Sequence, residues 1–281
     1  MAVGSETLSF GADSVHSGER VIGGMLSGSV VRQEIRERRK GLSRASVKLV
    51  SGSVVGNGFA AYNATGMHLR VEGGAQDGVG KGSLGGKVII LRGLNRHGVR
   101  INGCVGKGLA YGAQRGLFIV QGNADSRAGI RLSGADIIIG GEISTPLDDA
   151  RAGVANRANM KGFAFEYMTG GRALVLGDPG PWICSGMTGG VVYVRIQPEM
   201  GLTVEAIRRR IAKGAKVSIV RLDTGGILDV QELLSAYQKE LVRSGQQEEA
   251  QRLAPLYETP DDHFMMIKAG ASQTAQDVAT E

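Results

Sequence analysis

A glycine-rich segment at residues 78–88 has the spacing most suggestive of chemistry, because glycines followed by a lysine can cradle a phosphate group. A phosphate loop needs a glycine, four further residues, and then Gly-Lys-Ser or Gly-Lys-Thr opening a helix. Here Lys81 stands where the first glycine is required relative to Gly86 and Lys87, and Val88 replaces the hydroxyl residue. Strand-like residues follow, so no helix N-terminus would face a ligand. The segment does not predict nucleotide binding.

The remaining reactive side chains predict neither a metal site nor a catalytic group. Cys104 and Cys184 are far apart in the sequence, and Cys184 lies beside Ile183, where a small buried thiol is expected. Glu166 stands between two aromatic residues, a setting typical of a carboxylate that binds backbone N–H groups. The histidines are scattered without His-x-x-x-His spacing: His16, His68, His97 and His263. We therefore predict no catalytic, cofactor-binding or metal-ligating residue.

The dominant pattern is a glycine followed by a short aliphatic run. It recurs before residues 67–71, 88–91, 117–120, 137–139, 173–176 and 191–194. Several intervals are about 18 to 20 residues, the length scale of a short stacked repeat. The runs are too short for helices and rich in β-branched residues, and glycine permits positive φ at corners. The glycines expected to have this structural role are Gly78, Gly80, Gly82, Gly85, Gly86, Gly170, Gly171, Gly186, Gly189 and Gly190.

This pattern predicts an all-β fold in which strands of successive coils pair in parallel, a parallel β-helix. One coil cannot bury its own strand, whereas stacked coils line up their inward side chains into a continuous core. The 45 glycines and 5% aromatic residues suit a narrow interior filled by small aliphatic side chains. The polar, proline-containing stretch at residues 144–161 reads as an inserted loop.

We divide the chain into four parts. They are a mobile N-terminal arm with a short basic helix (1–44), the glycine-rich β-helix (45–196), a helical cap over its end (197–270) and a disordered tail (271–281). The basic helix is expected at residues 30–40. In the cap, Thr203 is expected to begin one helix, and Asp229 a second, with Glu232 three residues on. The second helix carries an apolar stripe of Val230, Leu233, Leu234, Tyr237 and Leu241.

The charge pattern does not favour nucleic acid. The net charge of +6 comes in part from basic residues at 32–48. Glu34 and Glu37 interleave with them, and no aromatic residue is present to stack on bases, so a solvated helix face is the simpler interpretation. The first residues lack a signal-peptide pattern and no window suits a membrane span, so a cytoplasmic protein without membrane or nucleic-acid partners is expected.

Two dense motifs identify a family resemblance. Glu-Tyr-Met-Thr-Gly-Gly-Arg at residues 166–172 and Ser-Gly-Met-Thr-Gly-Gly at 185–190 closely resemble the C-terminal glycine-rich (GXGXG) domain of the glutamate synthase large subunit. So do the segment at 78–87 and Ile-Arg-Glu-Arg at 35–38. The resemblance spans roughly residues 30–194 and implies a right-handed parallel β-helix.

The resemblance also implies a function. That family's large subunit carries a glutaminase domain with an N-terminal cysteine nucleophile and a flavin barrel with an iron–sulfur cluster, whereas residue 2 here is Ala. The chain is similar to the β-helix domain as a separate, non-catalytic subunit of a hetero-oligomer, as in split glutamate synthase or N-methylglutamate synthase. It would hold an amidotransferase-like subunit and an FMN-dependent synthase subunit together, with FMN and the iron–sulfur cluster on those partners. Residues Glu166, Tyr167, Met168 and Arg172 are the candidate partner contacts.

Two alternatives remain open. The chain also resembles the C subunit of formylmethanofuran dehydrogenase and of the formyltransferase/hydrolase complex, but residues 166–172 are closer to glutamate synthase. An autonomous enzyme would need clustered aspartates on neighbouring coils, whereas the exposed strand positions carry Arg70, Glu72 and Arg92.

Overall fold

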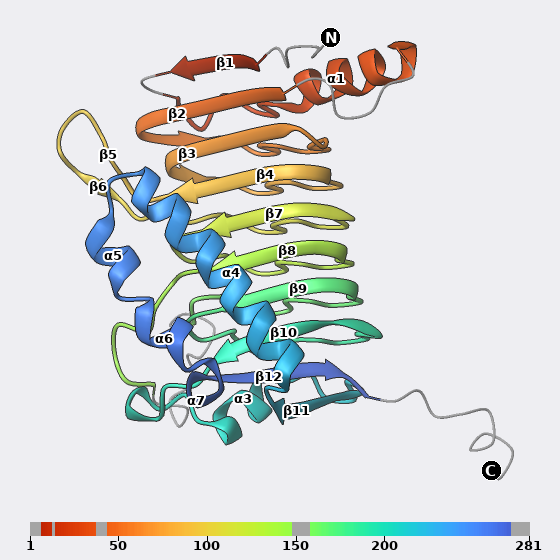
Figure 1. The fold of residues 1–281 in the computed structure, drawn as a ribbon, viewed down its shortest axis with the longest axis vertical. Coiled ribbons are helices and arrows are strands. Elements are labelled where there is room, and N and C mark those ends of the chain that lie inside the picture. The colour runs from red at the N-terminus through yellow and green to blue at the C-terminus, as the bar shows by residue number, and fades with distance from the viewer. Residues whose placement is uncertain (1–6, 13–14, 38–43, 148–157, 271–281) are drawn as a thin grey trace, which may run out of the picture.

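The computed structural model describes residues 7–12, 15–37, 44–147 and 158–270. One ten-stranded sheet dominates it, in the order β1-β2-β3-β4-β7-β8-β9-β10-β12-β11 (Figure 1). The strands from β1 to β10 in this order pair in parallel, and β12 and then β11 add antiparallel to the β10 edge. The strands are β1 (Thr7–Ala12), β2 (Arg44–Val55), β3 (Met67–Ala75), β4 (Leu84–Leu91), β7 (Arg115–Val120), β8 (Ser133–Ile139), β9 (Thr169–Val175), β10 (Gly189–Arg195), β11 (Val217–Arg221) and β12 (Phe264–Ala269). The predicted aliphatic runs are thus confirmed as strands.

The other elements lie at the ends and on one face of this sheet. Helix α1 (Gly24–Glu37) begins six residues earlier than the predicted basic helix. A two-stranded hairpin of β5 (Gly93–Leu94) and β6 (Arg100–Ile101) projects between β4 and β7. The C-terminal helices are η1 (Pro198–Met200), α3 (Val204–Arg210), α4 (Thr224–Arg243), α5 (Gln247–Gln251), α6 (Ala254–Glu258) and α7 (Pro260–His263). Most of the predicted insertion at 144–161 and the whole tail at 271–281 lie outside the described residues.

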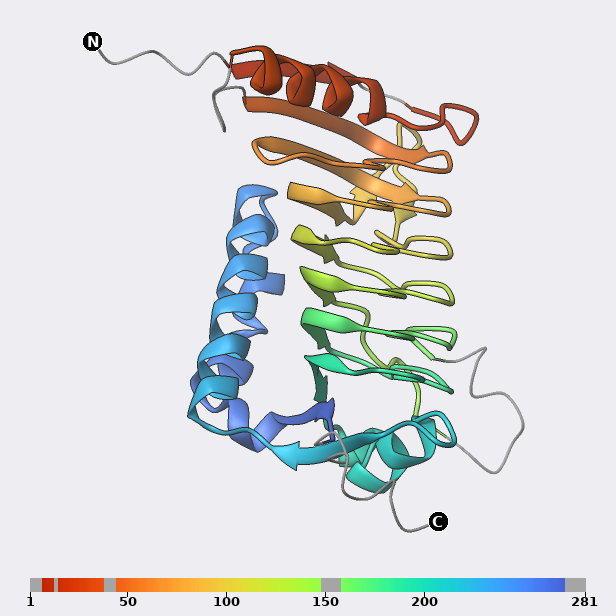
Figure 2. The ribbon, with the colours of Figure 1, turned by 90° about the vertical axis from the view of Figure 1, so that its right-hand side faces the viewer.

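The sheet is buried on both faces. Alternate side chains of β4 show this: Val88 and Ile90 belong to one core, and Ile89 and Leu91 to another. The first core lies between the sheet and the turns that connect its strands. The second lies between the sheet and α4, so that helix and turns occupy opposite sides of the strands (Figure 2). Strands buried on both faces read as continuous aliphatic runs rather than alternating ones.

The predicted fold class, an all-β right-handed parallel β-helix, is wrong. The sheet is mixed because β12 runs antiparallel to both of its neighbours, β10 and β11, and a layer of helices covers one face, so the architecture is α/β-like. Outside the sheets, the parallel ladder is reduced to isolated bridges, such as Ala75 to Val105 and Val105 to Ala124. The physical reason is that the returning segments adopt left-handed backbone conformations that a continuous strand does not allow.

These returning segments form six stacked turns with one backbone pattern, in which every second residue has positive φ. The left-handed positions are 58, 60 and 62; 78, 80 and 82; 108, 110 and 112; 127, 129 and 131; 163, 165 and 167; and 182, 184 and 186. We call the first and third position of each turn outer and the second middle. All six middle residues are buried against the sheet: Ala60, Gly80, Ala110, Gly129, Phe165 and Cys184.

Hydrogen bonds join each turn to both of its neighbours. In the turn at 78–82, the outer N–H groups of Gly78 and Gly82 donate to carbonyls of the following turn, at 2.7 and 2.8 Å. The middle N–H of Gly80 donates the other way, to Phe59 O at 2.8 Å. The N–H groups of successive left-handed residues therefore point to opposite neighbours, which satisfies these donors without a strand.

The glycine pairs at the strand starts have a different cause. Gly86, Gly171 and Gly190 all have positive φ, between 74° and 89°. A Cβ on Gly86 would lie 2.3 Å from Met67 O, and one on Gly171 2.3 Å from Ala135 O. The backbone of each coil thus passes so close to its neighbour that only glycine fits.

Helix starts were predicted with mixed success. Thr203 caps α3 as expected, since its Oγ1 accepts a hydrogen bond from Ala206 N at 3.2 Å. Asp229 does not cap a helix, because α4 begins earlier, with Asp223 accepting from Gly226 N at 2.8 Å. The expected apolar stripe from Val230 to Leu241 is buried, but it faces the sheet, so α4 covers a face of the sheet, whereas α3 lies at the end of the stack (Figure 1).

Asp229 instead belongs to an ionic cluster that joins α4 to the sheet. Arg172 on β9 makes two hydrogen bonds to Asp136 on β8, at 2.7 and 2.9 Å, and one to Asp229 at 2.6 Å. Its Nη1 also donates to Glu232 at 2.8 Å, and Tyr193 Oη donates to Asp229 at 2.6 Å. The hydrogen bonds to Asp136 raise the pKa of Arg172 above its ordinary value and outweigh burial, which acts to lower it. The pKa of Tyr193 is also raised above its ordinary value, chiefly by burial.

A second ion pair is fully enclosed. Arg210 at the end of α3 donates from Nε and Nη2 to both oxygens of Asp178, at 2.6 and 2.8 Å, and both side chains are at most 2% exposed. Such bidentate geometry is what a buried pair needs to offset its desolvation.

The turns predict that two glycines of the same conformation differ in their tolerance of alanine. Gly80 and Gly108 have φ of 64° and 69°. A Cβ on Gly80 would meet Phe118 Cε1 at 2.0 Å, whereas one on Gly108 meets nothing within 4 Å. Gly108→Ala should cost about 1 kcal/mol for the left-handed conformation, and Gly80→Ala about 1–3 kcal/mol more for overpacking. Urea unfolding followed by circular dichroism measures both, and equal losses would contradict the packing argument.

The ionic cluster predicts that Arg172→Ala destabilises the chain by about 2 kcal/mol, because Asp136 and Asp229 would face each other unneutralised. Arg172→Lys should restore only part of this loss, since an ammonium cannot bind Asp136 with two parallel hydrogen bonds. Arg208→Ala is the control, because its pair with Glu205 is largely exposed, and it should change stability by less than about 0.5 kcal/mol. A loss for Arg172→Ala no larger than for Arg208→Ala would exclude the cluster as a stabilising feature.

The two cysteines should differ in reactivity. Cys184 is fully buried, and burial raises the pKa of its thiol to about 12, whereas Cys104 is partly exposed. Since the thiolate is the reactive form, iodoacetamide at about pH 8 should add once to the native chain and twice after denaturation. Intact mass measures this, and Cys104→Ser should abolish native labelling. Rapid native labelling of Cys184 would show that the turn core opens.

Candidate functional site

The described residues offer no clustered metal ligands and no spanning segment. No group of three or more His, Cys, Asp or Glu side chains in this part of the chain is placed to hold a metal ion. Among the same residues, no helix is both long and apolar enough to cross a lipid bilayer.

The glycine-rich segment at 78–82 has no free N–H groups at its left-handed positions with which to hold a phosphate. Gly78, Gly80 and Gly82 all donate to neighbouring turns. Lys81 lies over the ring of Tyr111, with Nζ 5.6 Å from the ring centroid. The structure thus gives a backbone reason for the mismatch seen in the sequence.

The predicted partner-contact corner does not present its four side chains together. Tyr167 is 53% exposed, but Met168 is fully buried in the core between sheet and turns. Glu166 is half-buried, and its carbonyl accepts from Arg131 N. Arg172 is engaged in the ionic cluster with Asp136, Asp229 and Glu232. Of the four, Tyr167 is the one whose side chain is mainly available at the surface.

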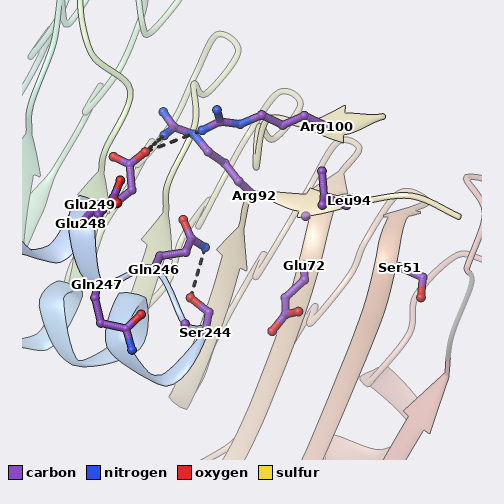
Figure 3. Close-up of a pocket in the computed structure, with 12 residues that line it drawn as sticks. Ser51, Glu72, Arg92, Leu94, Arg100, Ser244, Gln246, Gln247, Glu248 and Glu249 are labelled. Atoms are coloured by element: carbon purple, nitrogen blue, oxygen red, sulfur yellow. Dashed lines mark hydrogen bonds and ion pairs between the residues drawn. The ribbon is translucent and has the colours of Figure 1, made fainter. Parts of the chain in front are cut away.

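A cleft of about 800 Å³ lies where the α4–α5 corner approaches the hairpin of β5 and β6 (Figure 3). Glu249 of α5 is central, since it pairs with Arg92 at 3.2 Å and with Arg100 at 3.7 Å. On the other side Glu72 pairs with Lys48 at 3.5 Å and Arg70 at 3.2 Å. No histidine or cysteine is among the residues that line this cleft.

Amides complete the contact between helix corner and sheet. Gln121 Nε2 donates to Gln246 Oε1 at 2.6 Å, and Gln246 Nε2 donates to Ser244 Oγ at 3.1 Å. Gln121 Oε1 in turn accepts from Arg92 N at 2.8 Å. With carboxylates matched to guanidinium groups, this arrangement is suited to holding α5 against the sheet rather than to proton transfer.

Sequence reasoning placed Arg70, Glu72 and Arg92 at exposed strand positions, but their side chains are only 14%, 23% and 23% exposed, because each binds a partner that this reasoning missed. Arg70 pairs with Glu240 of α4 at 3.0 Å, and Arg92 pairs with Glu249. These partners are about 160–170 residues away in the sequence, so no local spacing could signal them. The available signal for such a partner was a basic residue, such as Arg70, set between aliphatic residues of a strand.

Comparison with known proteins identifies relatives along most of the chain. A 173-residue match to the large chain of glutamate synthase [NADPH] from Bacillus subtilis is 32% identical and covers 60% of this chain and 10% of the relative. Ferredoxin-dependent glutamate synthase from Cyanidium caldarium is 28% identical over 219 residues, 74% of this chain and 12% of the relative. Ferredoxin-dependent glutamate synthase 2 from Arabidopsis thaliana is 34% identical over 161 residues, 55% and 9%.

The chain thus matches only about a tenth of the length of these curated relatives. The family model described as the GXGXG motif matches residues 5–147 and again residues 150–269. The resemblance found in residues 30–194 is confirmed and extended by this result. With nearly its whole length matched, the chain belongs to the GXGXG motif family, in the form found in the glutamate synthases.

Proposed function

We propose that this chain is a structural module of a glutamate-synthase-type assembly, and that it holds an amidotransferase-like unit and an FMN-dependent synthase unit at a set separation. The observation that carries the proposal is the family match across residues 5–147 and 150–269, with relatives named as glutamate synthases. Those relatives are about ten times longer than the matching region, which supports the presence of other units beside it.

The physical character of the chain agrees with a scaffold. The six turns bind one another through their own N–H groups, and the large cleft is lined by charges that offset one another. A rigid body of this kind contributes to catalysis by fixing distance, since an intermediate such as ammonia then passes between two sites without dilution. FMN and an iron–sulfur cluster are proposed on the partner units and not on this chain.

The proposal is tested by isolating the tagged full chain from its native cells under mild salt, with mass spectrometry and absorption spectroscopy of whatever is retained. We expect a flavin-coloured assembly that contains an amidotransferase-type unit and forms glutamate, or an N-substituted glutamate, from glutamine-derived nitrogen. The chain produced alone is the control, and it should be colourless and inactive.

Two results would contradict the proposal. Stoichiometric FMN on the chain alone would exclude a purely structural role. Retention of molybdenum- or tungsten-containing partners would favour the one-carbon alternative, a subunit of a formylmethanofuran dehydrogenase or formyltransferase/hydrolase complex.

A further inference from the structure

The outer positions of the six turns carry an unusual set of residues. Twelve residues occupy them, all with positive φ. Six are glycine (Gly58, Gly78, Gly82, Gly108, Gly112 and Gly186), four are aromatic (Tyr62, Phe163, Tyr167 and Trp182), and two are arginine (Arg127 and Arg131). The glycines show that the turn needs no side chain at these positions.

The four aromatic side chains lie on the surface of the turns, on the side of the sheet opposite α4. Their exposed fractions are 61% for Tyr62, 41% for Phe163, 53% for Tyr167 and 52% for Trp182. Phe163 and Trp182 stack with ring centroids 5.0 Å apart, and Tyr167 lies against Gly186, where a Cβ would be 2.6 Å from its ring. Each ring is held in place but keeps about half of its surface open.

These residues are kept at a conformational cost that glycine would avoid. A bulky side chain with left-handed φ is strained, whereas glycine adopts this conformation freely. Each ring is about half-buried, which offsets part of this strain but leaves a large aromatic surface open. Side chains held in strained conformations are typical of functional surfaces.

The same surface is positively charged. Lys81, Lys107, Arg127 and Arg131 are exposed, and none of them makes an ion pair among the described residues. Asp125 is neutralised by Lys161 at 2.9 Å. The cations of the helix side, in contrast, include Arg70, Arg92 and Arg172, which are paired within the chain. The turn surface also carries Asp77 and Glu166, which make no ion pair among the described residues, so four unpaired cations there outnumber two unpaired carboxylates.

We infer that the outer surface of the turns, from Tyr62 to Trp182, is a docking surface for a folded protein partner that presents carboxylates beside an apolar patch. Tyr, Trp and Arg are the residue types that dominate the energy of protein interfaces. The inference rests on the proposed function, which supplies protein partners, and names the side of the chain that one of them contacts. The experiment below also distinguishes this partner from two other occupants of the surface, a second copy of the chain and a nucleic acid.

The experiment compares the native assembly formed by the tagged full chain with that formed by the double variant Phe163→Gly/Trp182→Gly. Glycine removes both rings and adopts the left-handed conformation without strain, so the fold should be retained, which thermal unfolding checks. We expect the retained partner, quantified by mass spectrometry and flavin absorbance, to fall at least about tenfold. Leu228→Ala is the matched control, since this exposed side chain lies on α4, on the other side of the sheet, and should leave retention unchanged.

Trp182 also gives a direct readout, because it is the single tryptophan of the chain. Incorporation of 5-fluorotryptophan yields one ¹⁹F resonance, which should shift or broaden in the assembly relative to the isolated chain. Raising the salt concentration should weaken retention, and so should the double variant Arg127→Glu/Arg131→Glu, because the partner presents carboxylates to these cations.

The outcomes separate this inference from the proposed function. If the wild-type chain retains the flavin assembly and the double variant retains it equally well, the docking surface is refuted and the proposed function stands. If the wild-type chain retains no such partner, the proposed function fails and the inference fails with it. Self-association in light scattering, or binding to a fluorescein-labelled single-stranded DNA, that the double variant abolishes would assign the surface to a different occupant and overturn the inference.

Discussion

The structure depends on the alternation of left-handed residues in the six turns. Every second residue has positive φ, and the N–H groups of successive left-handed residues point in opposite directions, so an inner turn binds both the turn before it and the turn after it. No turn can satisfy its backbone alone, so the unit of stability is the stack. The alternation also directs the middle residues, from Ala60 to Cys184, into the core, and leaves the outer residues facing away from the sheet.

The two sides of the sheet then acquire different roles. On the helix side, arginines on the strands reach carboxylates of α4 and α5, as in Arg70 with Glu240 and Arg172 with Asp229. The charged groups on this side pair with one another within the chain, and these ion pairs hold the helices on the apolar face. On the turn side, Lys81, Lys107, Arg127 and Arg131 have no carboxylate partner among the described residues, and the aromatic rings beside them are exposed. The same residue types thus stabilise the fold on one side and are available for recognition on the other.

Local signals in the sequence predicted local structure well. Short β-branched runs after glycine became strands, and the spacing of Val230, Leu233 and Leu241 correctly marked an amphipathic helix, because periodicity reports which residues will be buried. The cap at Thr203 could be predicted because it is a local contact: its hydroxyl accepts from the N–H of Ala206, three residues along the chain. The motifs at 166–172 and 185–190 correctly indicated the family, since glycines at close backbone approaches leave few substitutions open.

Tertiary structure decided what those local signals left open. The sequence alone indicated the strands, the apolar helix stripe and the glycine-rich turns, because each is marked by a local pattern of residue types. It did not determine that β12 would pair antiparallel with β10 and β11, or that α4 would cover a face instead of an end. Nor did it reveal that Asp229 would bind Arg172, 57 residues away, instead of capping a helix. These outcomes depend on contacts between segments that are distant in the chain. Such contacts form only when the core has assembled and brought the charged groups of both segments together.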